Sequence, residues 1–272
     1  MIPKLSPSLV LVSLISSQRK VGTPAENARL MPELESFMHV RNVTVSFLAA
    51  ATMLMAETAQ ERLKEASVVF TEIMGTPEKG IPEELLGKAN CIVIVPGMKS
   101  GAIGIGGKYG RGYAMCRNKS GVGWGPPAAM RVEGGSIGFQ IGGQSTDVIM
   151  LVMNDRGMQA LLKSKFTLGG DASVAAGPAG REATAKTDAS MGAEILSWSR
   201  AKGIFAGVSL QGATLRNDDE GNHELYGKDV ESKDILTSDI AAPPEARPLI
   251  AALNRYSKVE GRDSADRVKE DK

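Results

Sequence analysis

The sequence has few aromatic residues, few cysteines and no excess of charge of one sign. Phe, Trp and Tyr make up only 4% of the 272 residues, whereas 31 residues are glycine and 13 are methionine. The core must therefore consist of aliphatic and small side chains, with backbones in close contact. The formal net charge is +1, so the chain lacks the basic excess of a typical nucleic-acid-binding protein, and we expect no nucleic-acid partner.

Metal-ligating residues are equally scarce. The chain has two histidines and two cysteines, Cys91 and Cys116, and it contains no CxxC pair. We therefore expect neither a structural metal nor a cofactor. Both cysteines lie in strand-like apolar runs, and the sequence leaves open whether they form a disulfide or remain two buried free thiols.

The first 56 residues do not have the pattern of a folded domain. From Met38 a short basic stretch leads into the apolar run 43–55, which ends at Ala56 in the order of a secretory signal peptide. The run is shorter than the ~20 residues that a membrane-spanning helix needs. We expect residues 1–37 to be an upstream extension and residues 38–56 a signal peptide, so that the protein is exported to the periplasm or cell envelope. The alternative is a disordered arm followed by a buried helix.

The remaining chain is predicted to form one domain over residues 57–256 and a disordered charged tail over 257–272. Helical spacing of apolar residues predicts an amphipathic helix over 57–74. From 97 to 143, 15 of 47 residues are glycine, interleaved with large apolar residues in a strand pattern. The absence of strands that alternate with long helices argues against a doubly wound parallel sheet. We predict an α+β fold: a glycine-rich, largely antiparallel sheet, sandwich-like or barrel-like, with helices packed at the N- and C-terminal ends.

Individual elements follow from the same patterns. Short helices are predicted over 83–86, from Asn154 to about 163, and over 242–255, and a polar turn over 217–222. Strands are predicted at 91–95, 145–153, 166–168, 173–176, 193–199 and 204–215.

One motif suggests an enzyme. The stretch GGSIG at 134–138 fits the G-x-S-x-G pattern of serine hydrolases, in which the serine lies on a turn between a strand and a helix. The residues after Ser136 have a strand pattern instead, and the one base available after residue 56 is His223, beside a polar turn. We therefore predict no enzymatic activity and no catalytic residues, and we rank a serine hydrolase last among the possible functions.

Basic residues on and beside the glycine-rich strands are the candidate binding residues. They are Lys99, Lys108, Arg111, Arg117, Lys119, Lys163, Lys165 and Arg181. Taken singly, each is better explained as a solvated loop charge. Several close together would hold a lipid phosphate through charge-assisted hydrogen bonds. We expect Lys108 and Arg111 to lie at one rim, with Lys163 and Lys165 nearby.

Five stretches of the sequence resemble the SYLF domain family. They are ANCIVIVP at 89–96, WGPPA at 124–128, the run 134–181 that begins GGSIGFQIGGQSTDVIM, GIFAGVSLQGATL at 203–215 and LYG at 225–227. The resemblance covers residues 60–256 in order and without a large gap. It is far more specific than any of the short catalytic motifs.

The resemblance implies a lipid-binding module without catalytic residues. Eukaryotic relatives bind phosphoinositide membranes, the yeast actin-patch members also bind actin, and bacterial relatives are usually exported single-domain proteins. This chain shows no further partner-binding or zinc-finger domain, which puts actin binding in doubt, and no cysteine suited to lipidation. We expect non-catalytic binding of anionic or phosphoinositide-like lipid head groups at a membrane surface. The alternative is a structural or protein-partner-binding envelope protein.

The helix predicted over 57–74 has two interpretations. It is a membrane contact, or its apolar face packs against the sheet of its own domain, which better explains a face of this width. The two interpretations predict opposite burial for Leu63, Phe70 and Ile73.

The leader generates a first testable prediction. Protein isolated from its native cells should have a mature N-terminus near Glu57, because signal peptidase removes the segment that ends at Ala56. Intact-mass spectrometry with N-terminal peptide mapping measures this directly. A cytosolic protein that retains residues 1–56 would contradict the prediction.

Overall fold

The computed structural model describes residues 57–76, 80–103, 105–137, 142–178, 192–201, 203–208 and 210–257. These residues belong to a compact unit that is separate from residues 1–56. The expected upstream extension, the expected signal peptide, residues 258–272 of the expected tail and the candidate Arg181 lie outside the described residues. Within the described part of the chain, no helix is both long enough and apolar enough to cross a membrane.

A nine-stranded sheet forms the centre of the domain, in the order β5-β9-β3-β2-β1-β4-β7-β6, with β8 paired to β7. The strands are β1 (Cys91–Ile103), β2 (Ile105–Cys116), β3 (Ala128–Ile137), β4 (Gly142–Val152), β5 (Lys165–Thr167), β6 (Val174–Ala176), β7 (Ile195–Ala201), β8 (Ile204–Gly207) and β9 (Thr214–Asn217). All pairs among the described strands are antiparallel except β6 with β7. The chain passes from one end of this order to the other through residues 168–173, so the sheet is curled like a half-barrel.

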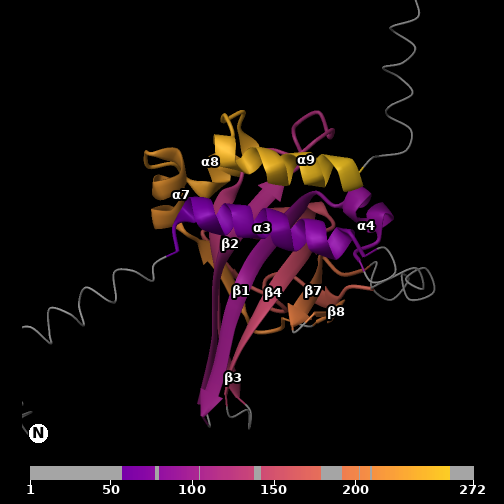
Figure 1. Ribbon diagram of the computed structural model, residues 1–272, viewed down its shortest axis with the longest axis vertical. Coiled ribbons are helices and arrows are strands. Elements are labelled where there is room, and N and C mark those ends of the chain that lie inside the picture. Colours follow the sequence, from indigo (N-terminus) through magenta and orange to yellow (C-terminus); the bar gives the residue numbers. More distant parts are fainter. Residues whose placement is uncertain are drawn as a thin grey trace, which may run out of the picture. The chain divides into compact units, whose positions relative to one another are not determined.

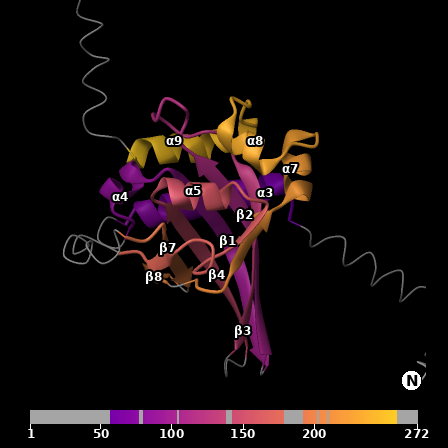
Figure 2. The same ribbon diagram turned by 180° about the vertical axis from the view of Figure 1, so that it is seen from behind.

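Helices cover both faces of the sheet. They are α3 (Ala59–Met74), α4 (Glu83–Lys88), α5 (Asp155–Leu161), α7 (Asp219–Tyr226), α8 (Ser232–Thr237), the 3₁₀ helix η3 (Pro244–Ala246) and α9 (Arg247–Tyr256). Figure 1 shows α3 and α9 across one face, which we call the outer face. Figure 2 shows α5 on the opposite, inner face. The predicted α+β class, with helices from both ends of the domain packed on a mostly antiparallel sheet, is confirmed.

The amphipathic helix α3 packs on the sheet of its own domain. Thr58 and Glu61 form a capping box that begins the helix. Leu63, Phe70 and Ile73 are 0%, 0% and 4% exposed, which confirms the second interpretation of this segment. Its apolar face is therefore not available to a membrane.

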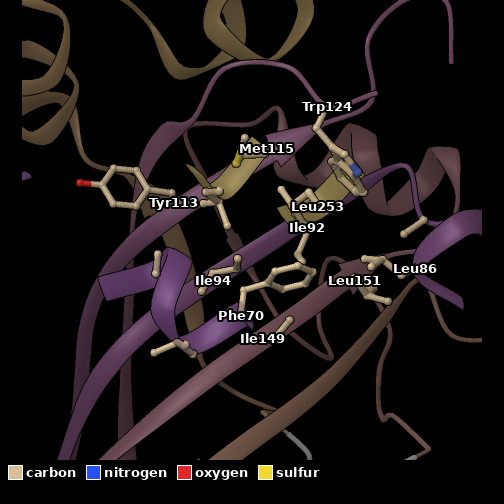
Figure 3. Close-up of a cluster of buried hydrophobic side chains, with 14 of the residues drawn as sticks. Phe70, Leu86, Ile92, Ile94, Tyr113, Met115, Trp124, Ile149, Leu151 and Leu253 are labelled. Carbon is tan, nitrogen blue, oxygen red and sulfur yellow. The ribbon is translucent and has the colours of Figure 1, made fainter. Parts of the chain in front are cut away.

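The central strand β1 contributes to two separate cores because its side chains alternate between the faces. Ile92 and Ile94 point to the outer face and pack with Phe70 of α3 and Leu253 of α9, as Figure 3 shows. Val93 and neighbouring inner-face residues fill the second core inside the curl, beneath α5 and α8.

A β-bulge interrupts β1 at Pro96 and Gly97. The strand was predicted to end at residue 95, but it continues to Ile103 with a shifted register against both β2 and β4. Gly97 has φ +52°, which favours glycine. On β2, a Cβ atom at Gly112 would lie 2.1 Å from the carbonyl oxygen of Ile94, so the two backbones meet at a distance that only glycine permits.

Several other expectations need correction. The polar stretch 217–222 is not a loop turn. Its residues form the end of β9, the N-cap of α7 and the first helical turn of α7. The strand expected over 204–215 is two strands, β8 and β9, and α8 was not foreseen. The question left open for Cys91 and Cys116 is answered, because they form a disulfide between register partners on β1 and β2.

The close approach at the bulge generates a prediction about stability. Gly112→Ala should lower the free energy of unfolding by about 1–3 kcal/mol or more, because the added methyl overlaps a backbone carbonyl that cannot rotate away. Urea denaturation monitored by tryptophan fluorescence measures the change. Gly143→Ala is the matched control in the same sheet: its Cβ would meet nothing within 4 Å, so its stability should change by less than about 0.5 kcal/mol. Equal stability of the two variants would contradict the prediction.

Candidate functional site

Four basic residues lie side by side across four neighbouring strands. Lys165 on β5 is the register partner of Arg216 on β9, Arg216 of Arg131 on β3, and Arg131 of Arg111 on β2. Directly opposed residues in an antiparallel sheet share a face. Arg111 is two residues from Tyr113, which belongs to the outer core, so all four lie on the outer face. We call this set the basic row.

Asp218 balances one end of the basic row. Its carboxylate lies 2.6 Å from Nε of Arg111 and 3.8 Å from Nε of Arg131, and its side chain is 1% exposed. The position follows from local structure, since Asp218 caps α7 by accepting a hydrogen bond from the Gly221 amide. Its own amide donates to the carbonyl of Ala129 on β3. The helix cap therefore serves also as the counter-ion of two arginines.

Accessibility increases along the basic row. The side chains of Arg111, Arg131 and Arg216 are 22%, 32% and 44% exposed, and Lys165 is exposed. Two further carboxylates lie close: Glu220 is 3.7 Å from Arg111, and Glu133 is 3.3 Å from Arg216. Four cations thus face three carboxylates, and Lys165 has no ion-pair partner among the described residues.

Some donor capacity of the row is unused. Nη2 of Arg111 and Nε of Arg131 are buried atoms without a hydrogen-bond partner in the described structure. Burial disfavours the charged form of Arg111, but the hydrogen bond and charge of Asp218 outweigh that effect and raise the pKa of Arg111 above its ordinary value. The guanidinium group of Arg111 therefore remains charged beside Asp218.

The other candidates are dispersed. Lys108 lies three residues from Arg111 on β2, and its partners are Ser100 and Gly134, so it points to the inner face and does not share a rim with Arg111. Lys99 donates a hydrogen bond to Ser145 at 3.0 Å. The remaining lysines pair with acidic neighbours: Lys119 with Asp239 at 3.2 Å and Lys163 with Asp171 at 3.8 Å.

Arg117 has a structural role. Its guanidinium donates to the carbonyls of Leu86 and Ala89 at 2.9 and 3.3 Å and to the hydroxyl of Ser257 at 3.2 Å. It also stacks over the ring of Trp124 at 4.2 Å. Arg117 therefore joins the end of α4, the end of β2 and the residue that follows α9.

Two of the four residues in the basic row, Arg111 and Lys165, were predicted from the sequence, whereas Arg131 and Arg216 were not. Arg131 lies on a strand whose face could not be assigned without its register. Arg216 follows an apolar run that was read as one long strand. The sequence did contain a signal: Arg131 lies between Met130 and Val132, and Arg216 follows Leu215. In a strand, this alternation places each arginine on the face opposite to that of its buried neighbours.

The hydrolase motif does not form a catalytic site in the described structure. Ser136 lies within β3, where it pairs with Gly106. His223 lies on α7, next to Asn222, whose side chain accepts a hydrogen bond from the Ala129 amide. Ala129 and Ser136 are seven residues apart on one strand, or roughly 23 Å. This separation is far beyond the reach of a nucleophile and its base.

A cavity of about 290 Å³ lies beside α5 and α8. Its charged lining residues already have partners: Lys119 pairs with Asp239, Asp155 accepts a hydrogen bond from Asn90, and Arg117 binds main-chain carbonyls. No group of His, Cys, Asp and Glu suited to a metal ion occurs among the residues that the structure describes.

Comparison with known proteins identifies relatives of the domain. Residues 133–256 match the family described as Ysc84, a Las17-binding protein and actin regulator. The chain is similar to SH3 domain-containing protein PJ696.02 of Schizosaccharomyces pombe (37% identity over 177 residues). It is also similar to SH3 domain-containing YSC84-like protein 1 of Rattus norvegicus (32% over 205 residues) and to protein YSC84 of Saccharomyces cerevisiae (34% over 176 residues).

These matches cover most of the chain but only part of each relative. They include 64%, 74% and 64% of this chain, and 41%, 58% and 37% of the fission yeast, rat and budding yeast proteins, respectively. The family description specifies binding, and none of these relatives is named for a reaction, which supports a non-enzymatic binding role.

The buried ion pair at the basic row generates a further prediction. Asp218→Asn should destabilise the domain by about 2–4 kcal/mol at neutral pH, because it leaves the partly buried charges of Arg111 and Arg131 without a counter-ion while preserving the shape of the helix cap. Thermal and urea denaturation measure the loss. Glu220→Gln removes the other carboxylate near Arg111, which is 83% exposed, and should change stability by less than about 0.5 kcal/mol. Comparable effects of the two changes would show that Asp218 is not the required counter-ion.

Proposed function

Because the chain belongs to the SYLF domain family, the family of Ysc84, we propose that it binds anionic phospholipid head groups at a membrane surface without catalysing a reaction. The observation that carries this proposal is the basic row, which places four cationic side chains on one face of the sheet. Each basic residue near an anionic surface contributes about 1 kcal/mol, so the row supports weak, salt-sensitive attachment.

The spacing of the row suits phosphate groups. Neighbouring strands lie about 4.8 Å apart, so adjacent guanidinium and ammonium groups can contact oxygens of one phosphate or of two adjacent head groups. Arginine binds phosphate with two parallel hydrogen bonds, whereas lysine acts as a point charge. The accessible residues Arg131, Arg216 and Lys165 would make the contacts, and Arg111 would hold its neighbours in place through Asp218.

The proposed location is outside the reducing cytosol. The leader over residues 38–56 has the pattern of a signal peptide. The disulfide between Cys91 and Cys116 supports the same proposal, because such bonds persist mainly in oxidising compartments. A periplasmic or envelope membrane would then present the anionic lipid.

A protein partner is the second candidate, because the matching family is described as Las17-binding. An acidic protein surface would use the same exposed cations as a lipid head group. Vesicle binding and protein crosslinking distinguish the two candidates. A domain that does not bind vesicles but crosslinks to one protein would favour the protein partner.

Vesicle sedimentation tests the lipid proposal. Residues 57–272 should sediment with phosphatidylglycerol or cardiolipin vesicles at low salt and less at high salt. The triple variant Lys165→Gln/Arg131→Gln/Arg216→Gln should lower the affinity by about 3 kcal/mol, or roughly a hundredfold. The variant removes the proposed phosphate contacts and three of the four cations of the basic row together.

A matched control removes three cations elsewhere. The triple variant Arg156→Gln/Lys228→Gln/Lys233→Gln has the same net charge, and all three residues are exposed and lie outside the basic row. It should retain nearly wild-type sedimentation. The lipid proposal is wrong if the unmodified domain ignores anionic vesicles at low ionic strength, and the assignment to the row is wrong if both triple variants lose binding equally.

A further inference from the structure

The ends of β1, β2, β3 and β4 project beyond the rest of the domain. β9 pairs with β3 only up to Glu133, and β7 pairs with β4 only from Asp147 onward. Past these residues, four strands continue in the order β3-β2-β1-β4, with the paired strands β1 and β2 in the middle and β3 and β4 on the two edges. Figures 1 and 2 show these ends extending past the helices on both faces. We call this part the strand extension.

The strand extension carries no charge. No Asp, Glu, Lys or Arg occurs between Lys99 and Lys108, or between Glu133 and Asp147. Exposed strand ends of a soluble protein normally carry charges that oppose association. The last register positions are apolar instead, with Ile105 paired to both Ile103 and Ile137. The extension therefore places uncharged strands, with isoleucine at their last register positions, at the end of the domain.

Basic, acidic and aromatic residues surround the base of the extension, where Tyr109 is the register partner of Glu133 on β3. Lys99 and Tyr109 are register partners on the outer face, and Tyr109 is 47% exposed. Lys108, one residue away, points to the inner face. Lysine and tyrosine are the residues that place an apolar body at a lipid boundary while their polar ends stay in the head-group layer. Both faces thus change from charged to uncharged at the same level.

The dimensions fit an interfacial anchor. Lys108 and Ile105 are three residues apart, or about 10 Å along the strand, and interfacial elements enter the boundary of head groups and acyl chains by about 5–10 Å. The outer edges of β3 and β4 have no strand partner in this part of the described structure. Unpaired backbone groups are costly in hydrocarbon, so the extension would stop in the polar boundary layer.

We propose that the strand extension inserts into the interfacial layer of a lipid bilayer as a β-structured anchor, with Lys99, Lys108 and Tyr109 at the head-group level. The inference deepens the proposed function and rests on it for the identity of the partner as a membrane. The basic row lies on the outer face about 10 Å above Lys108 along β2, close enough to an anionic surface for attraction at moderate salt. The row supplies salt-sensitive attraction, and the extension supplies attachment that persists in salt.

A second copy of the chain is a weaker choice of partner. Four strands at about 4.8 Å spacing and five residues of about 3.3 Å each offer roughly 300 Å² on one face. A stable protein interface needs about 800 Å² from each partner. The extension alone is therefore too small to hold a dimer, whereas a bilayer can contact both of its faces and its end.

Substitution at exposed glycines tests the anchor without disturbing the fold. A Cβ at Gly135 or at Gly143 would meet nothing within 4 Å, and both residues are exposed in the extension. Gly135→Asp and Gly143→Asp should each lower vesicle binding at high salt by about threefold to fivefold, because an ionised carboxylate resists entry into the boundary layer. Gly192→Asp, at an equally open glycine outside the extension, is the charge-matched control and should bind like the unmodified domain.

A fluorescent label reports insertion directly. The two cysteines of the chain are joined in the disulfide. A cysteine introduced by Gly135→Cys or Gly192→Cys is therefore the one free thiol, and an NBD dye labels it specifically. Vesicles of phosphatidylcholine with phosphatidylglycerol should shift the emission of the Gly135→Cys label to the blue and raise its intensity severalfold, with little change for Gly192→Cys. Circular dichroism melts of all variants confirm that they are folded.

The outcomes separate the two proposals. If the basic-row variants lose binding but the Gly135 label never responds on vesicles that sediment the domain, the anchor is disproved and the lipid proposal survives. If the label responds and the row variants bind normally, the anchor stands and the row is not the phosphate contact. If the Gly135→Asp domain stays on vesicles and sizing shows a dimer that this change breaks, the extension is a self-association surface and the anchor is wrong.

Discussion

The bulge in β1 is the constraint on which the rest of the domain depends. Up to Val95, the strand lies in the middle of the sheet with its side chains buried on both faces. Pro96 has no amide hydrogen to donate to a neighbouring strand. The amide of Gly97 donates instead to the carboxylate of Asp147, which also pairs with Arg200 on β7. Beyond the bulge, the same strand leaves the core and enters the strand extension, so one local irregularity separates the packed half of the sheet from the projecting half.

The basic row depends on the same sheet through its register. Its four residues come from strands that are far apart in the sequence, and they meet because each strand pairs without a slip near the row. A shift of one residue in β3 or β9 would turn an arginine into the inner core. The apolar packing of Val132 and Leu215 inside the curl therefore positions the charges on the outside. The same alternation of side chains thus sets both the packing of the inner core and the position of the basic row.

The sequence predicted the fold class because its signals are local. Helical spacing identified α3, and alternation of glycine with apolar residues identified the sheet. The stretch 217–222 was mispredicted because Asp and Asn favour turns and helix caps equally. In the structure, Asp218 caps α7 and Asn222 binds the backbone of β3 and the hydroxyl of Ser232. These roles arise from contacts with distant segments, which no short window of sequence contains. The same limit hid Arg131 and Arg216, since their positions are set by register and not by spacing.

The passage of the chain from β5 to β6 has a consequence for how the domain folds. β5 pairs with β9, and β6 pairs with β7, so both short strands precede their partners in the sequence. A chain that emerges from its N-terminus can form the β1-β2-β3 meander early, because those contacts are local, and β4 then returns to pair with β1. The β4 edge of this four-stranded unit remains open until β7 is available, and the β3 edge until residues up to Asn217 are available. Closure of the curl is the late, entropically costly step, and during that interval the partly formed sheet is most exposed to pairing with the wrong strand or the wrong chain.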